Sequence, residues 1–96
     1  MEYKIRIEPI AYSQILESID FLKNVSLEAA ENLYKEINES IDSLKTMPFR
    51  YPVDPTYQVS DEEERKMIIG KGRYFILYCI EKDTVCVEYF HDSRQV

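Results

Sequence analysis

Two amphipathic stripes separated by only three residues constrain the fold of this chain more than any other feature. Asn24-Val25-Ser26 is too short a break for anything except an antiparallel helical hairpin. Apolar residues spaced three and four apart are typical of helices with one buried face. The first stripe follows Pro9 and contains Ala11, Tyr12, Ile15, Leu16, Ile19 and Leu22, and the second contains Ala30, Leu33, Tyr34, Ile37, Ile41 and Leu44.

Strands are predicted on both sides of this hairpin. Residues 3–8 alternate in polarity, so Tyr3, Ile5 and Ile7 share one face of a strand, and Pro9 ends the pairing because it has no N–H to donate. After the helices, Met47–Val59 holds three prolines and predicts an irregular connection, and Asp61–Glu64 is expected to be a solvated acidic patch. Three further strands are predicted at Arg65–Gly70, Arg73–Ile80 and Thr84–His91, with turns at Gly70–Gly72 and Lys82-Asp83.

The element order is therefore β-α-α-β-β-β in a single domain covering residues 1–96. The expected fold class is α+β, with the helical hairpin packed on one face of a four-stranded antiparallel sheet. The first strand is expected to run antiparallel to the second where the two pair. Because Tyr74–Ile80 is almost continuously apolar, one of its faces needs a cover besides the helices. The outward set is either Ile76, Tyr78 and Ile80 or Phe75, Leu77 and Cys79.

Charge and composition exclude several classes of protein. The chain has 18 acidic and 12 basic residues and a net charge of −6, which argues against general nucleic-acid binding. Its longest apolar run is far shorter than the roughly 20 residues of a membrane span, so no membrane association and a cytoplasmic location are expected. Two cysteines and one histidine give neither a disulfide framework nor closely spaced metal ligands. We therefore expect no metal and no cofactor.

The order and spacing of several tracts resemble the RelE/ParE toxins. In that family an arginine opens the second strand, tyrosines alternate with apolar residues in the third, and His-x-x-Arg closes the fourth. Arg65, Tyr74, Tyr78, His91 and Arg94 match this pattern here. The tracts that carry the resemblance are Ser26–Ala30, Ile41–Pro52, Arg65–Ile69, Tyr74–Ile80 and Val85–Arg94, which together span nearly the whole chain.

The resemblance implies the toxin half of a type II toxin–antitoxin module, a growth inhibitor of the plasmid-stabilisation type. Such toxins are held inactive by a cognate antitoxin protein, and this chain is expected to form a homodimer when the antitoxin is absent. RelE-like members are ribosome-dependent mRNA endonucleases. ParE-like members share the fold but poison DNA gyrase without cleaving anything themselves.

The residues of a nuclease can be named on this sequence. Metal-independent RNA cleavage needs a proton carrier and cations that stabilise the charged phosphorane. His91 is the candidate proton carrier, and Arg65 and Arg94 are the candidate catalytic cations. Two of these residues also have a purely structural interpretation. His91 can be a residue that ends a strand, and Arg94 can be a surface charge that Asp92 offsets. Arg65 and its neighbour Lys66 point to opposite faces of a strand, so only one of them can face a common site.

The acidic net charge favours the noncatalytic, ParE-like branch, because a ribosome-bound nuclease must approach dense RNA phosphate. In this interpretation the exposed sheet face and the last strand bind a target protein, gyrase being the family's example. Three alternatives are expected to cover the outer face of the sheet: the antitoxin, a second copy of this chain, or the proline-rich connection. A non-toxic family member that acts only as a binding partner is a further alternative. The candidate binding residues are Arg65, Lys66, Arg73, Tyr78, Tyr89 and Arg94.

Overall fold

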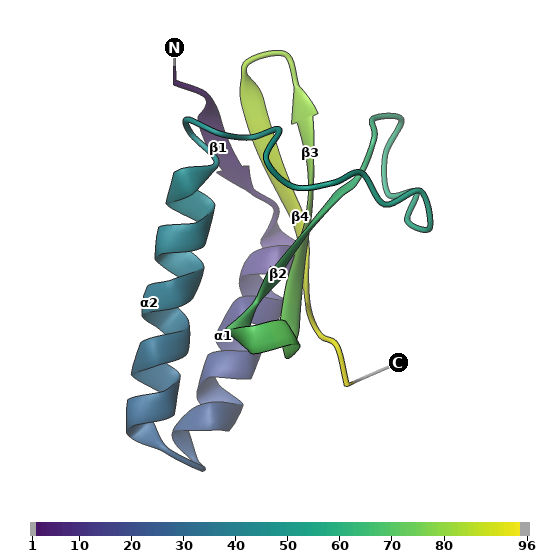
Figure 1. The fold of residues 1–96 in the computed structure, drawn as a ribbon. Coiled ribbons are helices and arrows are strands. Elements are labelled where there is room, and N and C mark those ends of the chain that lie inside the picture. The colour runs from purple at the N-terminus through teal and green to yellow at the C-terminus, as the bar shows by residue number, and fades with distance from the viewer. Residues whose placement is uncertain (1, 95–96) are drawn as a thin grey trace.

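A computed structural model describes residues 2–94, which form two helices and a four-stranded sheet (Figure 1). The order of elements is the one that the sequence predicts. The elements are β1 (Lys4–Ile7), α1 (Pro9–Lys23), α2 (Leu27–Ser43), β2 (Arg65–Ile69), the short 3-10 turn η1 (Gly70–Gly72), β3 (Tyr74–Glu81) and β4 (Thr84–Asp92).

The helical hairpin forms where the two stripes predict it. Pro9 opens α1, and Ser26 caps α2 by accepting a 3.1 Å hydrogen bond from the Ala29 amide. The predicted stripes are wider than the buried faces, because Tyr12, Leu16 and Tyr34 are exposed. The residues that the helices bury are Ala11, Ile15, Ile19 and Leu22 on α1 and Ala30, Leu33, Ile37 and Ile41 on α2.

The sheet is mixed, with strand order β1-β4-β3-β2. β2, β3 and β4 form the expected antiparallel meander, but β1 runs parallel to β4. The prediction of a fully antiparallel sheet is therefore wrong for β1, and so is the expected pairing of β1 with β2, which lie at opposite edges. β3 and β4 are the longest and most apolar strands, so they occupy the two central positions and leave the short strands as edges.

The direction of β1 follows from the helical hairpin. The two helices have similar lengths, so the end of α2 returns to the start of β1, where the Tyr3 amide donates to the Lys45 carbonyl at 2.8 Å. The Lys4 amide then donates to the carbonyl of Asp83, just before β4, at 2.8 Å, and the Glu8 amide donates to that of Val87 in β4 at 2.9 Å. β1 therefore pairs with the edge of β4 that β3 leaves open.

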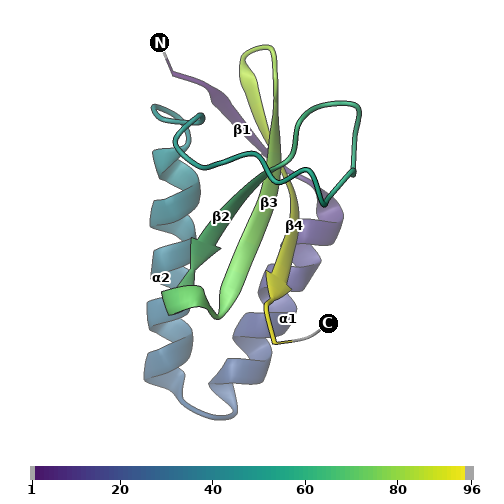
Figure 2. The same cartoon turned by 45° about the vertical axis from the view of Figure 1, so that its right-hand side comes forward.

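The two faces of the sheet are covered by different parts of the chain. In Figure 2 the helices lie behind the sheet, and the connection between α2 and β2 passes in front of it. Tyr74, Ile76 and Tyr78 face the helices and join the main core. The opposite set is Phe75, Leu77 and Cys79, which is buried as well. Of the covers expected for this outer face, the proline-rich connection is the one that the structure shows.

The connection is pinned to the outer face by contacts in its middle and at its end. The Tyr57 ring lies 5.9 Å from the Phe75 ring, measured between centroids. At its end, the side chain of Glu64 is only 2 % exposed. The expectation of a solvated acidic patch holds for Asp61, Glu62 and Glu63 but is wrong for Glu64, because the folded connection carries that carboxylate beneath itself.

The turn between β2 and β3 depends on backbone conformations that favour glycine. Gly70 and Gly72 have φ of +60° and +93°, and Lys71 lies in the same left-handed region at +56°. A Cβ atom at position 70 would lie 2.8 Å from the Tyr74 ring, so steric crowding also favours glycine at this position. Neither helix within residues 2–94 is long and apolar enough to cross a membrane.

Candidate functional site

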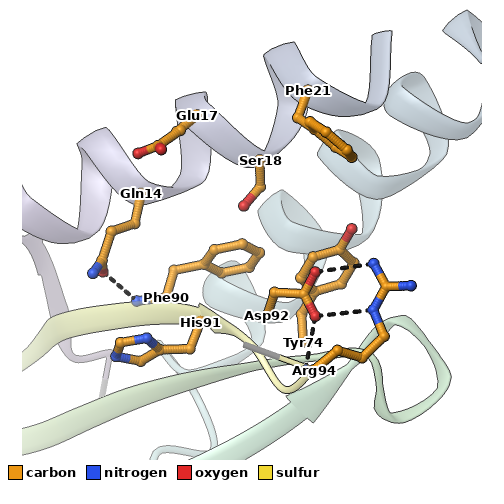
Figure 3. A pocket seen from close by; sticks show the side chains of 9 residues that line it. All are labelled: Gln14, Glu17, Ser18, Phe21, Tyr74, Phe90, His91, Asp92 and Arg94. Carbon is orange, nitrogen blue, oxygen red and sulfur yellow. Dashed lines mark hydrogen bonds and ion pairs between the residues drawn. The ribbon is translucent and has the colours of Figure 1, made fainter. Parts of the chain in front are cut away.

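A pocket of about 500 Å³ opens between α1 and the end of β4 (Figure 3). Its position is fixed by packing of α1 on the sheet. The Phe90 amide donates a 2.9 Å hydrogen bond to the Gln14 side-chain oxygen, and the Phe90 ring stacks on Tyr74 at 5.3 Å between centroids. The lining residues are Gln14, Glu17, Ser18 and Phe21 from α1, and Tyr74, Phe90, His91, Asp92 and Arg94 from the sheet and its C-terminal end.

The charged end of this pocket is organised around Asp92. Its carboxylate accepts hydrogen bonds from the Arg94 backbone amide at 2.9 Å and from the Arg94 guanidinium at 3.3 and 3.2 Å. Arg73 Nε lies 3.9 Å from the same carboxylate. The hydrogen bond from the Arg94 side chain, together with the nearby positive charges, lowers the pKa of Asp92. The expected offset of Arg94 by Asp92 is therefore present as a direct ion pair.

His91 is at the rim of the pocket, and its imidazole belongs to an aromatic row on the outer face. The ring lies 5.2 Å from the Phe75 ring and stacks on the Tyr89 ring at 5.6 Å. Lys66 Nζ lies 4.5 Å from the centroid of Phe75 and 5.7 Å from that of Tyr57. Lys66 and His91 thus both contact Phe75, and Tyr89 extends the row beyond His91, which makes a cationic and aromatic surface.

Arg65 is directed away from this row, as the alternation of the strand requires. Its guanidinium donates to the carbonyls of Tyr51 at 2.6 Å and Phe49 at 3.4 Å, and it lies 5.1 Å from the Phe49 ring centroid. In the sheet Arg65 pairs with Tyr78, whereas His91 pairs with Phe75, three residues away along β3. The structure therefore brings His91 and Arg94 to one pocket but does not bring Arg65 to it.

Tyr78 and Tyr89 have different environments. Tyr78 is fully buried at 0 % exposure, and its hydroxyl donates a 2.7 Å hydrogen bond to the Pro48 carbonyl. Burial raises the pKa of Tyr78 to about 12. Tyr89 is half-buried and retains access to solvent. Of the two tyrosines named as candidate binding residues, Tyr89 is therefore the one whose ring a second molecule can reach.

Sequence reasoning missed a second cluster of polar side chains, on the outer face. One potential ligand atom from each of Glu64, Cys79 and Glu88 lies within 4.8 Å of the others, and all three side chains are buried. Burial, reinforced by the neighbouring Glu64 carboxylate, raises the pKa of Glu88 to about 8. The available signal in the sequence was the single charge of Glu88 within the apolar run Val85–Phe90.

Comparison with known proteins finds a similar structure but no similar sequence. No protein-family model matches this chain, and no curated protein sequence matches it. Its structure is similar to a solved chain described as "Chromosomal ParDE TA system from P. aeruginosa", with a TM-score of 0.71 and 11% sequence identity. The alignment covers 95% of this chain and 96% of that chain. This chain therefore has a ParE-like α+β fold, in which two helices pack on a four-stranded mixed sheet.

Proposed function

We propose that this chain is the toxin of a type II toxin–antitoxin module and that it acts by binding a target protein, as ParE-like toxins do. The similarity in fold to a chain of a ParDE system supports the first part. The net charge of −6 supports the second, because a protein that docks onto ribosomal RNA benefits from an excess of Lys and Arg. DNA gyrase is the proposed target, which implies action in the cytoplasm.

The observation that carries the noncatalytic mechanism is the way Arg65 is engaged. RNA cleavage without a metal needs cations and proton carriers around one phosphate. Arg65 instead donates to the carbonyls of Phe49 and Tyr51 near the start of the connection. Arg94 is ion-paired with Asp92, and His91 is stacked between aromatic rings. These groups do not converge on a common point, which favours a role in folding for Arg65.

The proposed target-binding surface consists of the candidate residues that remain accessible at the end of β4. On the outer face, Lys66 lies over the buried Phe75, and Tyr89 stacks on His91. At the end of β4, Arg73 and Arg94 are grouped around Asp92. A surface that combines aromatic rings with arginine is typical of the residues that dominate protein–protein binding.

One observation favours RelE-like cleavage as a second candidate. His91 and Arg94, a proton carrier and a cation, line the same pocket of about 500 Å³. An approaching phosphate that displaced Asp92 from Arg94 would meet both side chains. In this alternative the chain is a metal-independent endoribonuclease that acts on ribosome-bound mRNA, and His91 transfers the proton.

The antitoxin is proposed to cover apolar side chains that the fold leaves exposed on the helices. The connection already covers the outer face of the sheet, which removes most of the surface first expected to receive the partner. Tyr12 and Leu16 lie one turn apart on α1 and are 56% and 42% exposed. Tyr34 on α2 is exposed as well. Because this chain is acidic, its partner is expected to contribute apolar and basic residues, and a second copy is expected to cover the same patch when the antitoxin is absent.

Induced expression in bacteria tests the toxin assignment. The wild-type chain is expected to arrest growth, and co-expression of the protein encoded by the adjacent reading frame is expected to restore it. Leu16→Asp should remain toxic but escape this rescue, whereas Ser13→Ala, at an exposed position of α1 outside the pocket, should remain both toxic and rescued. Folded protein that leaves growth unchanged would contradict the toxin assignment and favour a non-toxic binding partner.

A further inference from the structure

The cluster of Glu64, Cys79 and Glu88 is assembled from three separate parts of the chain. Glu64 ends the connection, Cys79 lies on the outer face of β3, and Glu88 comes from β4. Val85 and Val87 face the core, so alternation along β4 places Glu88 on the outer face with Cys79. A β-bulge follows directly: Leu77 pairs with Tyr89 and Tyr78 pairs with Val87, so Glu88 is the extra residue between them.

The cluster is closed to solvent, and some of its carboxylate oxygens have no hydrogen-bond donor. Glu64 and Glu88 are 2% and 7% exposed, and Cys79 is 1% exposed. Glu64 Oε2 accepts a 3.0 Å hydrogen bond from the Ser60 hydroxyl. Glu64 Oε1 and Glu88 Oε1 are buried without any hydrogen-bond partner. Buried carboxylate oxygens in a protein interior normally have a donor or a cation beside them.

No positive side chain balances these carboxylates. Among residues 2–94, no Lys, Arg or His nitrogen lies within 4.0 Å of a Glu64 or Glu88 oxygen. Lys66, which is on the same face, places its ammonium over the Phe75 and Tyr57 rings instead. Two neighbouring carboxylates cannot both stay ionised in a buried site unless a cation or a shared proton lies between them.

The donor set identifies the class of cation. One thiolate and two carboxylates suit a borderline-soft divalent ion that accepts tetrahedral coordination, which is the chemistry of zinc and disfavours calcium and magnesium. With zinc–sulfur and zinc–oxygen bonds of about 2.3 and 2.1 Å, neighbouring donors lie about 3.5 Å apart. The three donors here lie within 4.8 Å of one another, so small side-chain adjustments close the site. Ser60 is positioned to orient the Glu64 carboxylate from outside the coordination sphere.

We propose that Glu64, Cys79 and Glu88 form a buried binding site for a zinc-class divalent cation, with a fourth position left for water. The site joins the end of the connection to both central strands. Binding therefore fixes the connection against the outer face of the sheet, next to the aromatic row of His91 and Tyr89. This assignment does not depend on the toxin function proposed above.

Cobalt titration of the full-length, chelator-treated chain tests the site. A single equivalent of Co²⁺ is expected to produce the thiolate charge-transfer absorption of tetrahedral cobalt, and one equivalent of Zn²⁺ is expected to remove it. Zn²⁺ should also raise the unfolding temperature, because the cation binds only the folded state. A folded wild-type chain with neither the cobalt absorption nor a zinc-dependent shift would overturn the proposal and assign the site to a shared proton.

Matched variants test the ligands one by one. Cys79→Ser should abolish the charge-transfer absorption, whereas Cys86→Ser should retain it, since Cys86 is the cross-strand neighbour of Cys79 and lies outside the cluster. Glu88→Gln should weaken cobalt binding more than about 100-fold, because loss of an outer-shell partner alone costs 10–100-fold. Absorption that disappears in Cys86→Ser and persists in Cys79→Ser would contradict the assigned ligands. Because the wild-type spectrum is itself decisive, the test does not depend on every variant folding.

Discussion

The hydroxyl of Tyr78 donates a 2.7 Å hydrogen bond to the carbonyl oxygen of Pro48, 30 residues earlier in the chain. This bond joins the centre of β3 to the first proline of the connection. It is buried, and Tyr78 itself has no exposed surface. The connection is therefore held near its start by Tyr78 and by Arg65, and along the outer face by Tyr57.

Tyr78→Phe is expected to lower the free energy of unfolding by about 1–3 kcal/mol, because it leaves the buried Pro48 carbonyl without its donor. Urea denaturation of the purified chain measures this change. Tyr34→Phe is the matched control, since Tyr34 is exposed and should change stability by less than about 0.5 kcal/mol. Equal effects of the two substitutions would contradict the structural role of the Tyr78 hydroxyl.

Arg65→Met should destabilise the chain by about 1–2 kcal/mol and make the connection more sensitive to proteases. The substitution removes charged hydrogen bonds to the carbonyls of Tyr51 and Phe49. Limited proteolysis, with cleavage sites mapped by mass spectrometry, reports the loosening directly. Lys35→Met, at an exposed position of α2, should leave the cleavage pattern unchanged. Loss of activity in Arg65→Met at unchanged stability would instead assign Arg65 to the functional site.

Glu88 should make the stability of the metal-free chain depend on pH. Its pKa is about 8 in the folded chain against an ordinary value of 4.5, so the folded state binds the proton more tightly than the unfolded state. The stabilisation from this group is complete below about pH 4.5 and is lost as the pH rises through about 8. Urea midpoints measured across this range in the presence of chelator should fall accordingly.

The control for this pH effect is Glu88→Gln, which carries no titratable group at the same position. Its urea midpoint should fall less steeply than that of the wild-type chain between pH 5 and pH 8. The difference between the two curves isolates Glu88 from other titrating groups. Parallel curves for the two proteins would show that the folded and unfolded states bind this proton equally.

The features predicted correctly from sequence are those that depend on local pattern. The helices follow from apolar spacing and from the cap at Ser26, and the meander follows from short turns between β-rich runs. The direction and partner of β1 could not be predicted, because they depend on where the helical hairpin returns the chain. Local pattern likewise assigned the alternating faces of Arg65 and Lys66 correctly.

The candidate site was less predictable because its contacts join distant residues. Whether Arg65 faces a ligand or the carbonyl of Tyr51 depends on how the proline-rich connection folds, and no local signal encodes that path. The same path buries Glu64 at the end of an acidic run. The position of the β-bulge at Glu88 likewise has no signal in the local sequence of β4.

The most direct test of the proposed function compares two assays on the same purified protein: inhibition of DNA supercoiling by gyrase, and cleavage of mRNA on programmed ribosomes. The wild-type chain and folded His91→Ala are both expected to inhibit supercoiling and to leave the mRNA intact, because the proposed mechanism is binding without proton transfer. Cleavage of mRNA by the wild-type chain that is lost in His91→Ala would contradict this account.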